Sequence, residues 1–193
     1  SFHGHEVVGA KMARKILQNL HFSKEISEEV VSLIRWHMFF SDPDEISLSA
    51  VRRTIANVGE KGIWDLLNLR ICDRIGTGRP KEQPFRLRKY KSMVEEALRD
   101  PISVAMLKID GARIMAISSE KPSKRLGWVL HALLEEVLDD PIKNTEQYLE
   151  ERALALLSLP EEELRTVGEA GKGRRSEEDE KEIALLRKKY KVV

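Results

Sequence analysis

Apolar residues recur every three or four positions along most of the chain, which is the spacing of one face of an α-helix. The first such stripe runs from Val7 to Leu20. No stretch alternates between apolar and polar residues as a half-buried strand does. The pattern therefore predicts an all-α fold of about ten helices. The later helices are expected over about 30–37, 49–58, 64–75, 85–98, 123–138 and 145–157, with short pieces near 104–107 and 112–117.

Glycine and proline mark where several of these helices should begin or end. Gly59 and Gly62 separate the third helix from the fourth. Residues 76–84 are rich in turn formers, so a break between two helical parts is expected there. Pro160 opens a further helix with acidic residues in its first turn. The last stretch, 173–193, places acidic residues before basic ones and is interpreted as a mobile or partner-docked helix.

Composition adds limits to this picture. Hydrophobic residues make up 41% of the 193 positions and charged residues 34%, and the net charge is +1. Such a balance neither favours nor excludes nucleic acid, so only local clusters of charge are informative. Cys72 is the only cysteine and cannot form an internal disulfide, which fits a reducing cytoplasm. No apolar run approaches the roughly 18 residues of a membrane span.

Two basic clusters are candidates for contact with nucleic acid. The first lies in residues 79–91, where six basic residues accompany one acid, and Phe85 and Tyr90 fall among them. Lysine and arginine neutralise phosphates, and aromatic rings stack on unpaired bases. The second cluster lies at the start of a helix, where exposed amides can bind phosphate. The candidate residues are Arg79, Lys81, Arg86, Arg88, Lys89 and Lys91 in the first cluster, and Lys121, Lys124 and Arg125 in the second.

A simpler interpretation of both clusters stays open. Solvated helix faces are often rich in charge, and the basic residues of the first cluster can pair with Glu95 and Glu96.

Three residues far apart in the chain could hold a metal ion. His5 lies at a helix start, His37 near the end of the second helix, and Asp73 among apolar residues of the fourth. A carboxylate that faces inward needs a partner, and a metal or a histidine would serve. His3 is a weaker fourth member. Alternatively, the histidines pack or bond locally, and Asp73 pairs with a neighbouring arginine such as Arg70.

Several motifs in order resemble a known family. The stretches FHGHEVVGAKMARKIL, VVSLIRWHM and LLNLRICDRIGTG, followed by LKIDGARIMAI and KPSKRLGWVLHALLEEVLDDP, are similar to the bacterial tRNA nucleotidyltransferase and poly(A) polymerase family with an HD-domain body. The resemblance covers about residues 2–157. The segment ISSEKPSKR departs from the family, which often has a glycine- and proline-rich turn there, so a tight phosphate-binding turn is not expected.

The resemblance implies that separate domains of the enzyme carry out separate functions. In this family a head carries the metal-binding carboxylates for nucleotide transfer, with Mg²⁺, and a neck selects CTP and ATP. Neither is recognisable in the chain, and the His-Asp dyad of the HD domain is expected upstream of Phe2. His5, His37 and Asp73 would then be the remainder of an incomplete HD-type metal site, and no cofactor is expected in this chain. The implied domains are a partial HD-like domain at 1–78, an RNA-binding body and tail at 79–159, and a charged extension at 160–193.

The function that follows from the resemblance is binding of tRNA. The chain would grip the acceptor arm and outer corner by phosphate and shape recognition while a head, in the same parent chain or a separate one, adds nucleotides. Two alternatives remain. One is a remnant of an HD-type metal-dependent phosphohydrolase. The other is a helical scaffold or dimerisation module, in which the chain forms a homodimer.

Overall fold

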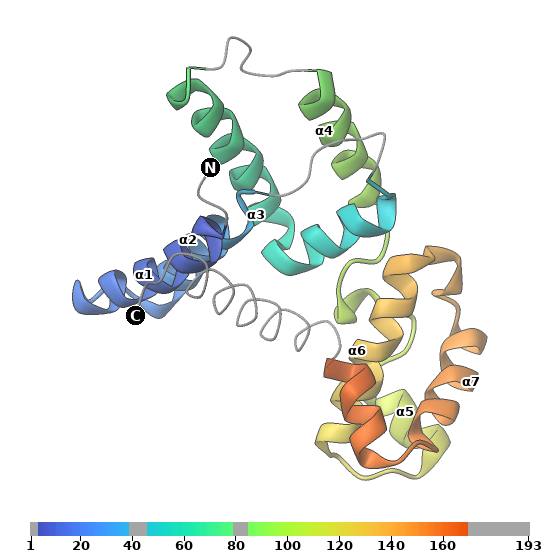
Figure 1. The fold of residues 1–193 in the computed structure, drawn as a ribbon. Helices are drawn as coiled ribbons and strands as arrows, with labels where there is room; N and C mark the ends of the chain where they lie inside the picture. The colour runs from blue at the N-terminus through green and yellow to red at the C-terminus, as the bar shows by residue number, and fades with distance from the viewer. Residues whose placement is uncertain (1–3, 39–45, 79–84, 170–193) are drawn as a thin grey trace. The chain divides into compact units, whose positions relative to one another are not determined.

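The computed structural model describes residues 4–38, 46–78 and 85–169. Every element with defined bounds in these ranges is helical, so the predicted all-α class is confirmed (Figure 1). The chain divides into two compact units, of which the first contains the described residues up to Glu96 and the second those from Ala97 onward. Within the described ranges, no helix combines the length and the hydropathy that crossing a bilayer requires.

The first unit begins with two helices that pack side by side, α1 (His5–Asn19) and α2 (Lys24–Trp36) (Figure 1). They approach closely at Gly9, where an added Cβ would lie 3.4 Å from the Ile34 side chain. Burial of the facing apolar residues stabilises the pair. These residues are Val7, Ala10 and Val31.

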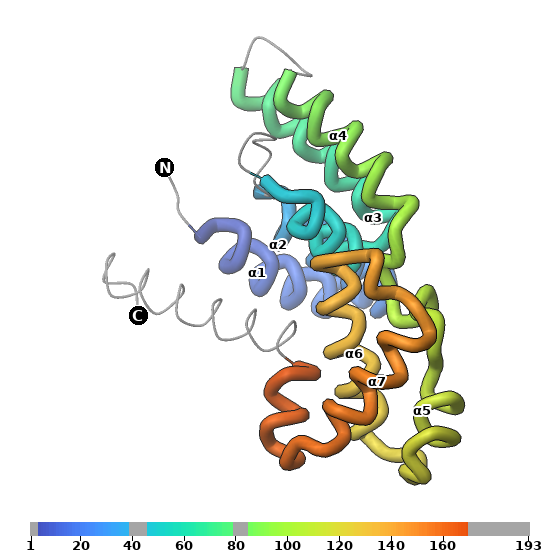
Figure 2. The backbone as a smooth tube through the Cα atoms, turned by 90° about the vertical axis from the view of Figure 1, so that its right-hand side faces the viewer, coloured from blue at the N-terminus to red at the C-terminus, as the bar shows by residue number. Residues whose placement is uncertain are grey.

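The long helix of this unit, α3 (Leu48–Gly76), is kinked at Gly59. Gly59 has φ 81° and ψ 162°, a backbone conformation that almost only glycine adopts. The sequence predicts two helices separated at this point, and the structure joins them end to end through the kink (Figure 2). Both halves contribute to the core. Their fully buried residues include Val51, Ile55, Ile63 and Leu66.

The next described helix is α4 (Phe85–Ala97), of which all but the last residue belongs to the first unit. Its buried residues Leu87, Tyr90 and Val94 recur at helical spacing and form one apolar face. The phenol of Tyr90 lies near the hydroxyl of Thr54 of α3, which places α4 against that helix. The expected turn at 79–84 lies outside the described residues.

The second unit is built around α6 (Lys124–Asp139), which contacts α5 (Gly111–Ser118), α7 (Glu146–Leu157), and the short 3₁₀ turns η1 (Val104–Met106) and η2 (Pro141–Lys143). Its buried residues follow the period of a helix that faces neighbours on several sides. They include Leu126, Val129, Leu133 and Val137.

Polar contacts hold α7 in place. Glu136 of α6 accepts hydrogen bonds from the Tyr148 hydroxyl and from Nε of Arg152, both at 2.7 Å. Arg113 of α5 donates from Nε to Glu150 at 2.6 Å. A carboxylate that accepts two bonds from one helix fixes the rotation of that helix as well as its position.

Asn144 joins the loop before α7 to the segment that follows η1. Its amide accepts a hydrogen bond from the N–H of Lys108 at 3.0 Å and donates to the carbonyl of Met106 at 3.1 Å. The residue that follows Asn144 is the N-cap of α7. The structure assigns the cap to Thr145, whose hydroxyl accepts from the N–H of Tyr148 at 3.3 Å.

A further helical stretch, 161–169, ends the described part of the second unit. It approaches α6 at Gly168, where an added Cβ would lie 2.5 Å from Cα of Trp128. Only glycine permits this approach. Leu164 of the same stretch is fully buried.

Candidate nucleic-acid interface

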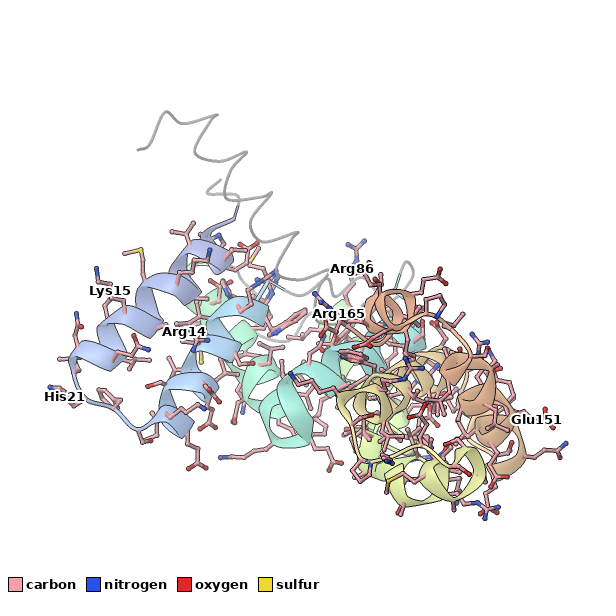
Figure 3. The ribbon with its side chains drawn as sticks, turned by 90° about the horizontal axis from the view of Figure 1, so that it is seen from below. Arg14, Lys15, His21, Arg86, Glu151 and Arg165 are labelled. Carbon is pink, nitrogen blue, oxygen red and sulfur yellow. The ribbon has the colours of Figure 1, made fainter. Side chains whose placement is uncertain are left out.

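The basic residues of α4 lie on the exposed side of that helix. Because Leu87, Tyr90 and Val94 take the buried face, the charged positions between them must face solvent. Figure 3 labels one of them, Arg86. The exposed basic residues of α4 are Arg86, Arg88, Lys89 and Lys91. Arg79 and Lys81, predicted for the same interface, lie outside the described residues.

A small groove separates α4 from α3 on one side. It has a volume of about 130 Å³ and combines apolar, amide and basic side chains. The ammonium of Lys91 lies 5.8 Å from the centroid of the Trp64 ring, within the range of a cation–π contact. The groove is lined by Trp64, Leu67, Asn68, Ile71, Leu87, Arg88 and Lys91.

Tyr90 anchors α4 beneath the basic face. Its side chain is fully buried, and burial raises its pKa to about 12, although the nearby Thr54 hydroxyl offsets part of the rise. The phenol is therefore neutral at physiological pH and acts as an anchor in the core. The basic residues on either side of it are consequently presented from a helix with a fixed rotation.

The second basic cluster divides into exposed and packed residues. Lys121 and Lys124 are exposed. Arg125 is half-buried, its Nη2 donates to the carbonyl of Leu157 at 2.8 Å, and its Nε lies 3.7 Å from Glu120. Arg125 thus ties α6 to the end of α7, and the two lysines are the residues of this cluster that present charge to solvent.

A larger open cavity, about 800 Å³, lies beside Trp128 in the second unit. Trp128 donates its ring N–H to Glu169 at 3.3 Å, and Arg165 pairs with the same carboxylate at 3.2 Å. Glu161 and Glu162 also line it. Three carboxylates outnumber the two fixed cations, Arg165 and Lys124, so this cavity is a poor match for phosphate.

The structure brings two of the predicted metal ligands together. Nε2 of His5 lies 3.0 Å from Nε2 of His37, although the two residues are 32 positions apart. Nδ1 of His37 is 2.6 Å from the carbonyl of Ile34, so it carries a proton and donates. With its proton on Nδ1, His37 can accept the N–H of His5 at Nε2. The pair is a hydrogen-bonded contact between the start of α1 and the end of α2.

Asp73 is held by a different partner. Its carboxylate accepts a hydrogen bond from Nη1 of Arg70 at 3.1 Å, one turn earlier in α3. Within the described ranges, no three His, Cys, Asp or Glu side chains form a group that could hold a metal ion. His3 lies outside the described residues. An incomplete metal site of His5, His37 and Asp73 stays a prediction.

The sequence interpretation did not single out the two tryptophans. Trp64 lies 27 positions before Lys91, and only the packing of α4 against α3 places their side chains together. Trp128 was one apolar residue of a helix, and its link to Glu169 spans 41 positions. No local pattern in the chain signals either contact.

Comparison with known proteins adds a second line of observation. The family model of tRNA nucleotidyltransferase domain 2 matches residues 7–153. The CC-adding tRNA nucleotidyltransferase of Thermus thermophilus is 33% identical over 147 residues, which cover 76% of this chain and 32% of that protein. The A-adding tRNA nucleotidyltransferase of Deinococcus radiodurans is 28% identical over 138 residues, which cover 70% of this chain and 31% of that protein. The matched region thus spans about a third of each relative. No solved structure matches the chain significantly.

Proposed function

Because this chain belongs to the tRNA nucleotidyltransferase domain 2 family, we propose that it is the tRNA-binding portion of a CCA- or A-adding enzyme. The observation that carries the proposal is the exposed basic face of α4, with four cations on a rigid helix beside the Trp64 groove. Cations held by a packed helix contact phosphates in a fixed register, which suits recognition of RNA by shape.

Nucleotide addition belongs, in this proposal, to polypeptide outside this chain. The two relatives are named for adding different nucleotides, CC in one and A in the other. In both, the match spans only about a third of the relative, so most of each relative lies outside it. The choice of nucleotide and the Mg²⁺-dependent chemistry are therefore assigned to a head and neck, with which this portion works in the cytoplasm.

The proposal is tested by neutralising two cations of α4 in the full chain. We expect Arg88→Gln with Lys91→Gln to weaken tRNA binding, because two phosphate contacts are lost. The magnitude of the slope of log affinity against log salt should fall by roughly 1.4 to 1.8, since each phosphate contact contributes about 0.7 to 0.9. Fluorescence anisotropy with labelled tRNA at several salt concentrations measures both quantities, and an RNA duplex of equal charge shows whether tRNA is preferred.

A matched control is available on α1. Arg14 and Lys15 are exposed and extend from the helix surface (Figure 3), so Arg14→Gln with Lys15→Gln changes the net charge by the same amount. This variant should bind tRNA as the unaltered chain does. Equal losses in the two double variants would mean that only overall charge matters, and no binding by the unaltered chain would reject the proposal outright.

A further inference from the structure

The Trp64 groove between α3 and α4 has the features of a binding site for a flat ring. Trp64 is half-buried, so part of its ring borders the groove. Leu67 and Leu87 are each 5% exposed and form an apolar floor. The volume of about 130 Å³ is on the scale of a single nucleobase and too small for a folded peptide element.

The rim of the groove carries polar groups of the kind that bind a nucleotide. Asn68 is exposed and offers both a hydrogen-bond donor and an acceptor to the edge of a base. Arg88 and Lys91 are exposed at the α4 side, and none of the described residues that line the groove carries a carboxylate. Aromatic rings next to cations are the recurrent arrangement in sites for single-stranded nucleic acid, because the ring stacks on a base while the cations meet the flanking phosphates.

We propose that this groove holds one unpaired base of the bound RNA, stacked on Trp64, with the adjoining phosphates at Arg88 and Lys91. The inference rests on the proposed RNA-binding function and adds a subsite to it. Lys91 lies over the ring in the unbound chain at 5.8 Å, where it occupies the place that a base would take. Binding would move its ammonium outward to a phosphate, so the ring exchanges a cation for a base.

The cavity beside Trp128 shows why the two tryptophans differ. The ring N–H of Trp128 donates a hydrogen bond to Glu169, and three carboxylates line that cavity. A phosphate chain passing there would meet like charge. A base stacked on Trp128 would therefore be disfavoured, and the proposal is confined to Trp64.

The test replaces the ring while keeping an apolar side chain. In the full chain, Trp64→Leu should weaken binding of a short single-stranded RNA and of tRNA about tenfold, the scale of one lost base–aromatic stack. Binding of a blunt RNA duplex should not change, because a duplex has no free base. Trp64→Phe retains a ring and should recover most of the affinity.

Trp36 supplies the matched control, since it is also half-buried in the first unit and also lies near a cation, with Arg35 5.4 Å from its ring centroid. Trp36→Leu should leave all three affinities unchanged. If Trp64→Leu behaves as Trp36→Leu does while the unaltered chain still binds tRNA, the base subsite is wrong and the wider RNA-binding function survives. If the unaltered chain binds no RNA, both fail together.

A second measurement tests the base subsite without replacing Trp64, so it still applies if Trp64→Leu does not fold. In a chain with Trp36→Phe and Trp128→Phe, Trp64 is the only tryptophan, because the sequence has three. Stacking of a base should quench its fluorescence on addition of single-stranded RNA and not on addition of duplex. Unchanged emission at saturating RNA would overturn the proposal.

Discussion

At the scale of single residues, burial decides what a side chain does more than its chemical type. Arg125 and Arg88 are both arginines in predicted basic clusters, yet Arg125 bonds to the carbonyl of Leu157 and Arg88 is exposed on the rim of a groove. Tyr90 was predicted to stack on bases and is instead a fully buried anchor. Each difference follows from which face of its helix the residue occupies.

The buried Tyr90 phenol makes stability depend on alkaline pH. Its pKa is about 12 in the folded chain and 10.0 in an unfolded one, so above pH 10 the unfolded chain loses a proton that the folded chain keeps. Stability should therefore be intact below pH 10 and fall as pH rises from 10 to 12, by about 2–3 kcal/mol at most.

Tyr90→Phe removes this proton and should flatten that part of the stability profile. Urea unfolding at pH 8, 10 and 11 measures it for both chains. Tyr148→Phe is a comparison, because the hydrogen bond to Glu136 also raises the pKa of this phenol, so its removal should change the alkaline profile in the same direction. An identical alkaline slope in the unaltered chain and Tyr90→Phe would contradict the assignment.

At the scale of helices, the kink in α3 depends on one glycine. Gly59 has positive φ and nothing lies within 4 Å of an added Cβ, so a substitution there is opposed by the backbone and not by a clash. Gly62, three residues later, is an ordinary helical glycine whose added Cβ would lie 3.4 Å from Val58, a normal contact. The two positions predict opposite effects of the same substitution.

Gly59→Ala should lower the free energy of unfolding by about 1–3 kcal/mol, because alanine strains this backbone conformation. Gly62→Ala should raise it by about 0.5–1 kcal/mol, because alanine loses less entropy in a helix. Urea denaturation of the two variants gives both signs. A stabilising Gly59→Ala would mean that α3 can straighten at little cost.

Helix α1 presents apolar residues on two sides. Val7 and Ala10 are buried against its neighbours, whereas Ile16 is 52% exposed. The continuous apolar stripe predicted from Val7 to Leu20 is therefore wider than the face that packs. The exposed members of the stripe are Val8, Met12, Ile16 and Leu20.

Because some isoleucines are buried and others are exposed, their replacement by alanine should lower stability by different amounts. Ile55→Ala, in the fully buried part of α3, should cost about 2–5 kcal/mol because it leaves a cavity. Ile16→Ala should change stability by no more than about 0.5 kcal/mol. Chemical denaturation compares them directly. A large loss for Ile16→Ala would show that another surface covers α1 in solution.

At the scale of the whole molecule, charge is distributed locally while the total stays near zero. The net charge of +1 combines a basic α4 in the first unit with carboxylates around Trp128 in the second. Contact with RNA, as proposed, depends on the first pattern alone. The matched double variants on α4 and α1 separate the effect of a local cluster from the effect of the total, because both change the total equally.

The all-α class, most helix positions and the family were determined by the sequence alone, because helical periodicity and ordered motifs are properties of neighbouring residues. The pairing of Asp73 with Arg70 lies within one helix and was among the alternatives that the sequence left open. Only tertiary packing decided that His5 meets His37 and that Trp64 faces Lys91. Both of these contacts join residues about 30 positions apart. Their distances depend on how whole helices cross, and the spacing of residues within one helix carries no information about that.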